Sequence, residues 1–136
     1  MPRTNVFRDA QLDYELGGQS NPVPASWWAS LATAAARTGV TEQTSGGVSR
    51  QELTRALATW SGGTTGMRSN ENAITFAAAA SAEISAAYIV LWDASSGGNA
   101  CRYYPIRDGA GNPITRTWSV GDAVIIDAGD LEITFG

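Results

Sequence analysis

The sequence contains no histidine and no lysine, and it has a single cysteine, Cys101, among its 136 residues. Without histidine, the Ser-His and Cys-His pairs of nucleophilic enzymes are excluded, and zinc and iron sites lose their commonest ligand. Without lysine, the Gly-rich phosphate loop that ends in Gly-Lys-Ser/Thr is excluded as well. One cysteine cannot form an intramolecular disulfide, and Cys101 is predicted to be a small buried hydrophobe. We therefore expect no enzyme, no cofactor and no metal site.

Clustered positive charge and long apolar runs are also missing. The formal net charge is −4 with a sequence pI of ≈ 4.6, and the nine basic residues are arginines scattered from Arg3 to Arg116. A nucleic-acid or anionic-membrane partner requires clustered positive charge. No apolar stretch approaches the ~20 residues of a membrane span, and the first residues lack the apolar core of a signal peptide. We expect a soluble protein made in the cytoplasm, with no nucleic-acid partner and no membrane span.

The residues that are abundant favour a β fold. Glycine occurs 15 times, and only 16% of the residues are charged. A chain of this length is long enough for one domain with its own core, and a composition rich in small and turn-forming residues is typical of all-β domains. We predict a mainly β fold, an antiparallel sandwich or barrel-like meander with a short N-terminal helix or arm. Residues 1–24 are predicted to form this arm and a linker, and residues 25–136 a single β domain.

The N-terminal arm carries the clearest helix signals. In TNVFRDAQLDYELGG, Thr4 or Asn5 can cap the start of a helix, and Gly17 and Gly18 can end it. The following GGQSNPVP is a breaker cluster that predicts an extended linker.

The segment ASWWASLAT predicts a strand with one indole on each face, because side chains alternate along a strand. Both faces are then covered, or one indole is exposed for a partner. We predict that at least one of the two tryptophans lies in the core between sheets. The candidate interface residues are Phe7, Leu12, Leu16, Trp27 and Trp28.

The rest of the chain is predicted to consist of short strands and turns. Residues 33–47 and 61–72 are predicted as loops, whereas the pattern of residues 48–60 fits either a helix or a strand. The strongest strand pattern is EISAAYIVLWD, and the strands after it have the regular spacing of a sandwich or barrel. In this strand Ile84, Ala86, Tyr88, Val90 and Trp92 are predicted to share one face.

The cluster DASSGGN after that strand contains oxygen-bearing side chains, Asp93, Ser95, Ser96 and Asn99. A calcium loop needs more carboxylates at fixed intervals and a bidentate glutamate. Gly-Gly-Asn instead provides the positive φ angles and local hydrogen bonds of a hairpin turn. We predict a turn that fixes the register of two strands.

Five further carboxylates follow in the C-terminal third. A glycosidase would need two of them facing each other across a cleft, and nothing in the sequence selects such a pair. Two of them follow a glycine at a strand boundary, in VGDA and AGDL, where capping of a turn is the predicted role of Asp122 and Asp130. The five residues are Asp108, Asp122, Asp127, Asp130 and Glu132.

Several segments, in order, resemble a family of small bacteriophage proteins described as tail-fibre-like. They are LDYELGG, VPASWWASLAT, TEQTSGGVSRQ, SNENAITFAAA, AYIVLWDASSGGNACRYYPI and VGDAVIIDAGDLEIT. Glu42, Gly46, Gly47 and Arg50 resemble a Glu-x-x-Gly-Gly-aromatic-x-Arg segment of that family, with three residues between Glu42 and Gly46 and with Val48 in place of the aromatic residue. We predict an ion pair between Glu42 and Arg50.

The resemblance implies a virion structural protein without catalytic residues. It implies a compact β module, a homotrimer or other symmetric assembly, that contacts itself and other virion proteins of the tail or the major capsid protein. A short tail fibre or spike component and a capsid decoration (cement) protein are both consistent with this length. A further alternative is a host-glycan-binding module that stacks sugars on Trp28, Trp60 or Trp118.

Overall fold

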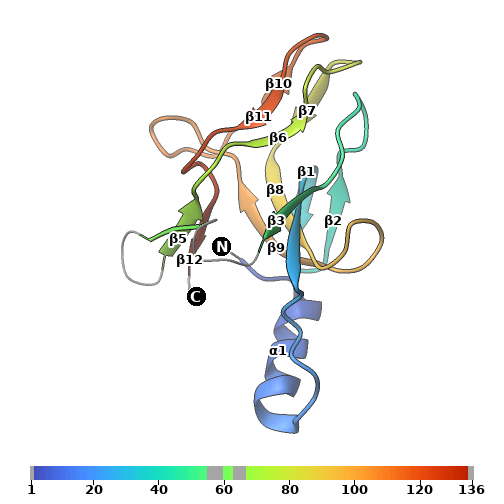
Figure 1. Cartoon of the computed structure of the whole chain (residues 1–136), viewed down its shortest axis with the longest axis vertical. Helices are drawn as coiled ribbons and strands as arrows, with labels where there is room; N and C mark the ends of the chain where they lie inside the picture. The colour runs from blue at the N-terminus through green and yellow to red at the C-terminus, as the bar shows by residue number, and fades with distance from the viewer. Residues whose placement is uncertain (1, 55–59, 63–66, 135–136) are drawn as a thin grey trace.

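The computed structural model describes residues 2–54, 60–62 and 67–134 and shows a mainly β chain with one N-terminal helix (Figure 1). Every strand pairing is antiparallel, and the sheets do not close into a barrel within the described residues. The predicted fold class is confirmed. The elements are α1 (Asn5–Gly17), β1 (Ser26–Ala36), β2 (Gly39–Glu42), β3 (Gln51–Thr54), β4 (Trp60–Gly62), β5 (Met67–Asn70), β6 (Ile74–Ala77), β7 (Ile84–Ala86), β8 (Tyr88–Trp92), β9 (Ala100–Pro105), β10 (Arg116–Trp118), β11 (Val124–Ile126) and β12 (Glu132–Thr134).

The largest sheet has five strands and is built around β1. Its order is β2-β1-β8-β9, and β3 pairs with the first part of β1. Trp27, Ala29 and Leu31 of β1 face the hydrophobic core, as the alternation predicts. The opposite face carries Trp28 and Ser30, and the hydroxyl of Ser30 accepts a hydrogen bond from the indole N–H of Trp92 at 2.7 Å.

The second half of the chain is one long antiparallel hairpin, broken into short paired segments. Strands β5 to β8 form one arm of the hairpin, and β9 to β12 form the other arm and pair with them in reverse order. The pairs are β8 with β9, β7 with β10, β6 with β11 and β5 with β12. We call residues 67–134 the long hairpin and residues 93–99 its tip. Neighbouring strands in the sequence therefore pair less often than in a simple meander.

The predicted continuous strand of residues 83–93 is wrong, because the structure divides it at Ala87. Ile84 and Ala86 belong to the core in β7, but the core residues of β8 are Ile89 and Leu91. The inward face thus changes its phase by one residue between the two strands. The backbone of Ala87 remains hydrogen-bonded at this break, since its N–H donates to Ala32 O at 2.9 Å and its carbonyl accepts from Ile106 N–H at 2.9 Å.

Two predicted loops also contain strands. Within residues 33–47, β1 continues to Ala36 and turns back as β2, and within residues 61–72 lies β5. The segment left open between helix and strand begins as strand β3, whereas residues 55–59 lie outside the described residues. These strands form because they pair with segments distant in the sequence or with a preceding strand. β2 and β3 both form backbone hydrogen bonds to β1, and β5 forms them to β12.

Helix α1 is fixed to the body at its first turn and extends away from the sheets (Figure 1). The predicted cap is confirmed: the buried Thr4 accepts from Phe7 N–H, and its hydroxyl donates to Ala100 O at 2.6 Å. Phe7 packs edge-on against Trp27 with ring centroids 5.7 Å apart, and it is the buried residue of the helix. Gly18 ends α1 in the left-handed conformation, at φ 72°.

No helix in the described parts of the chain is both long enough and apolar enough to cross a membrane.

Candidate functional site

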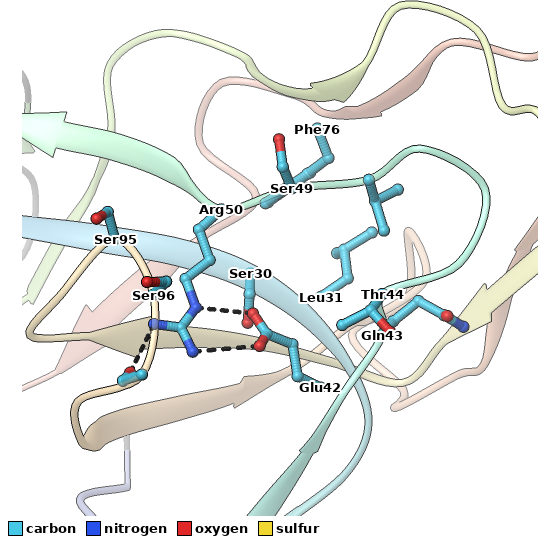
Figure 2. Close-up of a pocket in the computed structure, with 12 residues that line it drawn as sticks. Ser30, Leu31, Glu42, Gln43, Thr44, Ser49, Arg50, Phe76, Ser95 and Ser96 are labelled. Atoms are coloured by element: carbon cyan, nitrogen blue, oxygen red, sulfur yellow. Dashed lines mark hydrogen bonds and ion pairs between the residues drawn. The ribbon is translucent and has the colours of Figure 1, made fainter.

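The guanidinium of Arg50 is the centre of the best-connected polar site (Figure 2). Its Nε donates to Glu42 Oε2 at 2.8 Å, and its Nη2 donates to Glu42 Oε1 at 3.2 Å. Its Nη1 donates to the carbonyl oxygens of Ala94 and Gly97, at 2.8 and 2.9 Å. The guanidinium carbon also lies 3.7 Å from the ring centroid of Trp92. The predicted Glu42–Arg50 ion pair is present, and we call these contacts the arginine clamp.

The clamp connects three parts of the chain that are distant in sequence. Glu42 ends β2, Arg50 precedes β3, and Trp92 ends β8 just before the hairpin tip. The side chain of Arg50 is only 7% exposed and that of Glu42 is 23% exposed, so water weakens this bidentate pair little. The clamp therefore holds the hairpin tip against β1 and β2.

The hairpin tip is a turn, as predicted. Asp93 N–H donates to Asn99 O at 3.2 Å, and the Asp93 carboxylate accepts from Asn99 N–H at 2.7 Å and from its side-chain amide at 3.3 Å. Gly97 and Gly98 have φ values of 60° and 66°. No group of three or more metal-binding side chains lies within the described residues.

The cavity beside the clamp holds about 190 Å³, and Ser95 and Ser96 of the tip line it together with Arg50 and Glu42 (Figure 2). Ligand pockets usually measure roughly 300–1,000 Å³. Nη1 and Nη2 of Arg50 already donate to protein oxygens, so the guanidinium is engaged in holding the loop. The arrangement is that of contacts that hold the loop in place rather than of a ligand-binding pocket.

The outer surface of α1 is the second candidate site. Leu16 is 84% exposed and Leu12 is 52% exposed, and Val6 and Tyr14 are exposed as well. Large apolar side chains gathered on one projecting helix are typical of a contact surface.

Comparison with known protein families identifies the class of protein to which this chain belongs. Residues 2–134 match the family described as Gp80, podophage GP4 fiber I protein gp80. The chain belongs to this family. It is therefore a phage fibre structural protein, associated with the virion, and the resemblance to tail-fibre-like proteins is confirmed. A search of curated proteins found no match.

The candidate interface residues of this fibre protein fall into two groups. Phe7 and Trp27 are 3% and 9% exposed and pack against each other within the chain's own core. Leu12 and Leu16 are exposed, and Trp28 is half-buried. The internal packing accounts for Phe7 and Trp27, so a contact with another protein stays a prediction for Leu12, Leu16 and Trp28.

The tryptophans proposed for sugar stacking have different surroundings. Trp118 is 6% exposed and belongs to the core, so its faces are not available to a sugar. Trp60 is half-buried and packs against the core.

The late carboxylates also divide into groups. Asp108 accepts from the N–H groups of Asn112 and Ala110, which hold the pKa of its carboxyl below the usual range, and Asp122 accepts from Ser119 N–H at 2.9 Å. The sequence predicts the cap at Asp122 but not the one at Asp108. The side chain of Asp130, which the sequence also predicts to cap a turn, accepts no such bond within the described residues, and neither does that of Glu132.

Cys101 is buried in β9, as predicted. Burial raises the pKa of its thiol to about 12, with a further rise from Asp93 and an opposing effect of Arg102. The thiol is thus neutral at ordinary pH and chemically inert.

Proposed function

We propose that this fibre protein is a short fibre or spike module that assembles as a homotrimer through the outer face of α1. It works by assembly with itself and with other virion proteins rather than by catalysis. The observation that carries the proposal is the exposure of Leu12 and Leu16, at 52% and 84%, on a helix whose buried contact with the body, Phe7, lies in its first turn.

The helical repeat places these leucines on the side opposite the body. With 3.6 residues per turn, residues four apart share a face, and residues nine apart lie half a turn out of phase. Leu12 and Leu16 therefore form one apolar patch, and it points away from Phe7, which fixes the helix to the core. This geometry supports a contact between helices of neighbouring copies.

One of the four charged residues beside the leucines, Arg8, can pair with Asp9 or Asp13 of a neighbouring copy, whereas Glu15 would meet like charge there. By helical spacing, Arg8 and Glu15 flank one side of the patch, and Asp9 and Asp13 flank the other. Opposite charges beside an apolar seam set the partner and orientation in coiled coils. Burial of Leu16, which is 84% exposed, would contribute up to about 1.5–3 kcal/mol per copy, and burial of the half-exposed Leu12 would contribute less.

The mass of the full-length protein in solution tests this assembly. We expect size-exclusion chromatography with light scattering to give three times the 14.2 kDa chain for the wild type and one chain for the double variant Leu12→Gln/Leu16→Gln. Val120→Gln is the matched control, because Val120 is 67% exposed but lies outside α1. A monomeric wild type, or a double variant that remains trimeric, would contradict the proposal.

The position on the particle requires a separate measurement, the copy number per purified virion relative to the major capsid protein. We expect a few to a few tens of copies, as for a fibre or spike. Hundreds of copies would instead indicate a capsid decoration protein.

A further inference from the structure

The first residues of the N-terminal arm, residues 2–17, extend the largest sheet at the edge of β9. Thr4 N–H donates to Cys101 O at 2.9 Å, and Tyr103 N–H donates to Pro2 O at 3.1 Å. Addition of a strand to a sheet edge is a common way for one chain to bind another, because backbone hydrogen bonds supply the affinity. The bonds that the arm forms here are therefore available to the arm of any copy of this chain.

The arm is docked on the body at one end. Phe7 is 3% exposed and packs against Trp27, and the guanidinium carbon of Arg102 lies 5.6 Å from the Phe7 ring centroid. Residues 12–21, which form the second half of α1 and the start of the linker to β1, are all exposed. Figure 1 shows α1 extending away from the sheets and the linker returning beside it. Most of the arm is thus outside the body.

The joint between arm and body is imperfectly packed. Arg3 and Arg102 are opposite each other in the β-bridge, and like charges in opposite positions destabilise strand pairing. Burial, and after it the charge of Arg3, lowers the pKa of Arg102. A cavity of about 200 Å³ also lies at this joint, between Val6 of the arm and Trp92 of the body. Atoms that line a void lose dispersion contacts, so this joint is easier to open than a close-packed core.

The linker between α1 and β1 contains a hinge. Val23 packs against the core, whereas residues 18–21 are exposed and include Gly18 in the left-handed conformation, at φ 72°. The side-chain oxygen of Asn21 accepts from Val23 N–H at 3.0 Å, a bond that lies within the linker itself. A change of direction in residues 18–21 would therefore move the arm without disturbing β1.

The arm is long enough to reach a neighbouring copy. The 13 residues of α1 measure about 20 Å at 1.5 Å per residue. The hinge adds up to roughly 13 Å when extended, which gives a reach of about 33 Å. A globular chain of this length has a radius of gyration of about 14 Å, so a neighbour in contact lies within this reach.

An arm that crosses to a neighbour forms the same docking contacts as an arm on its own body. It also lies between two bodies, where Leu12 and Leu16 are covered, whereas an arm on its own body leaves both exposed. Exchange of an identical element is a low-cost route to oligomers, and neighbouring copies present their arms at high effective concentration. We propose that the copies exchange arms, so that residues 2–17 of each copy dock on β9 and Trp27 of the next copy. This inference rests on the proposed assembly through α1 and specifies how the copies are connected.

A disulfide between Arg3 and Arg102 positions tests the exchange. The bridge bonds are made by the residues flanking this pair, so it is a non-hydrogen-bonded pair with Cα atoms about 4.5 Å apart, within the range of disulfides. The full-length variant Arg3→Cys/Arg102→Cys, with Cys101→Ala to remove the native thiol, is oxidised and run on a non-reducing denaturing gel. We expect bands at two and three times the 14.2 kDa chain, which a reducing agent converts to single chains.

The control disulfide lies where no exchange is proposed. Ser85 and Thr117 are antiparallel partners within the long hairpin, with hydroxyl oxygens 2.9 Å apart. In the same background, Ser85→Cys/Thr117→Cys should give an internal disulfide and a single-chain band. The single variant Arg3→Cys should also give single chains. Equal amounts of linked chains in the single and double variants would indicate random collision and overturn the proposal.

The remaining outcomes separate exchange from assembly. A single-chain band with both thiols consumed would show that each arm docks on its own body. If the wild type is then trimeric by light scattering, exchange fails and assembly through α1 stands, whereas a monomeric wild type overturns both. Free thiols after oxidation would show that the arm docks on neither body, which also contradicts the proposal.

The wild-type chain provides a readout that does not depend on how the cysteine variants fold. Copies that are deuterated except for ¹³C-labelled phenylalanine are unfolded, mixed with unlabelled copies and refolded. Phe7 and Trp27 have ring centroids 5.7 Å apart, close enough for a nuclear Overhauser cross-peak. Because Trp27 of a labelled copy has no ring-carbon protons, a cross-peak from Phe7 to Trp27 must join two copies. We expect this cross-peak, and its absence from a trimeric sample would overturn the exchange.

Discussion

The hairpin tip and helix α1 are both exposed, but their side chains are engaged differently. Several polar groups of the tip are bonded within the chain: Asp93 to Asn99, and the carbonyls of Ala94 and Gly97 to Arg50. Helix α1 beyond Phe7 has exposed apolar side chains without internal partners among the described residues, Leu16 above all. The comparison suggests that a satisfied polar loop serves the fold, whereas an exposed apolar helix is available to another molecule.

Removal of the clamp should produce the largest effect. Arg50→Met leaves the Glu42 carboxylate and two loop carbonyls without their donor, and loss of one partner of a buried ion pair costs about 3–5 kcal/mol. We expect the free energy of unfolding, measured with urea, to fall by this amount. The control Val120→Ala should remain within about 0.5 kcal/mol of wild type, because Val120 is 67% exposed and lies outside α1. If Arg50→Met is as stable as the wild type, the arginine clamp does not stabilise the fold.

A substitution at the tip should have an intermediate effect. Gly98 and Gly97 both have positive φ, but a Cβ at position 98 meets Asp93 Oδ1 and Ala94 Cβ, whereas a Cβ at position 97 meets no atom within 4 Å. We expect each alanine variant to lose stability through backbone strain of about 1–3 kcal/mol, and Gly98→Ala to lose more than Gly97→Ala. Thermal unfolding of both variants tests the order, and the reverse order would show that the contact with Asp93 is unimportant.

A milder change at the same turn tests its chemistry. Asp93→Asn keeps an oxygen that can accept from Asn99 N–H, so we expect a loss below about 1.5 kcal/mol. The melting temperature of the wild type should also be the same with calcium and with a chelator, since the carboxylate binds backbone and amide groups. A melting temperature that rises with calcium would indicate a metal site instead.

The smallest effect concerns Cys101. Its folded-state pKa of about 12 is above the ordinary value of 9.0, so the folded state keeps its proton when the unfolded state loses it. The contribution of Cys101 to stability therefore falls as pH rises from 9.0 toward 12. At pH 8 we expect an alkylating reagent to leave the thiol unmodified in the native protein and to react completely in denaturant. Rapid alkylation of the native protein would contradict the burial.

Local signals allowed prediction of several parts of the fold and the site. Thr4, Gly17 and Gly18 identify the ends of α1, and Asp93 with Gly97, Gly98 and Asn99 identifies the turn, because capping and positive φ depend on neighbouring residues in the sequence. The ion pair of Glu42 and Arg50 was predicted as well, on the basis of family resemblance. Alternation along β1 also predicted that at least one of the two adjacent indoles lies in the core, and the structure shows that Trp27 does.

The sequence alone predicts a mainly β chain with a capped N-terminal helix and a hairpin turn after Trp92, and it excludes histidine-dependent chemistry. The folded structure was needed to show that the strand breaks at Ala87, that β10 to β12 return to β7, β6 and β5, and that Asp130 and Glu132 line the same cleft as Tyr104. The reason is physical: caps and turns are set by interactions over a few residues, whereas strand partners and unpaired charges depend on contacts between segments far apart in the chain.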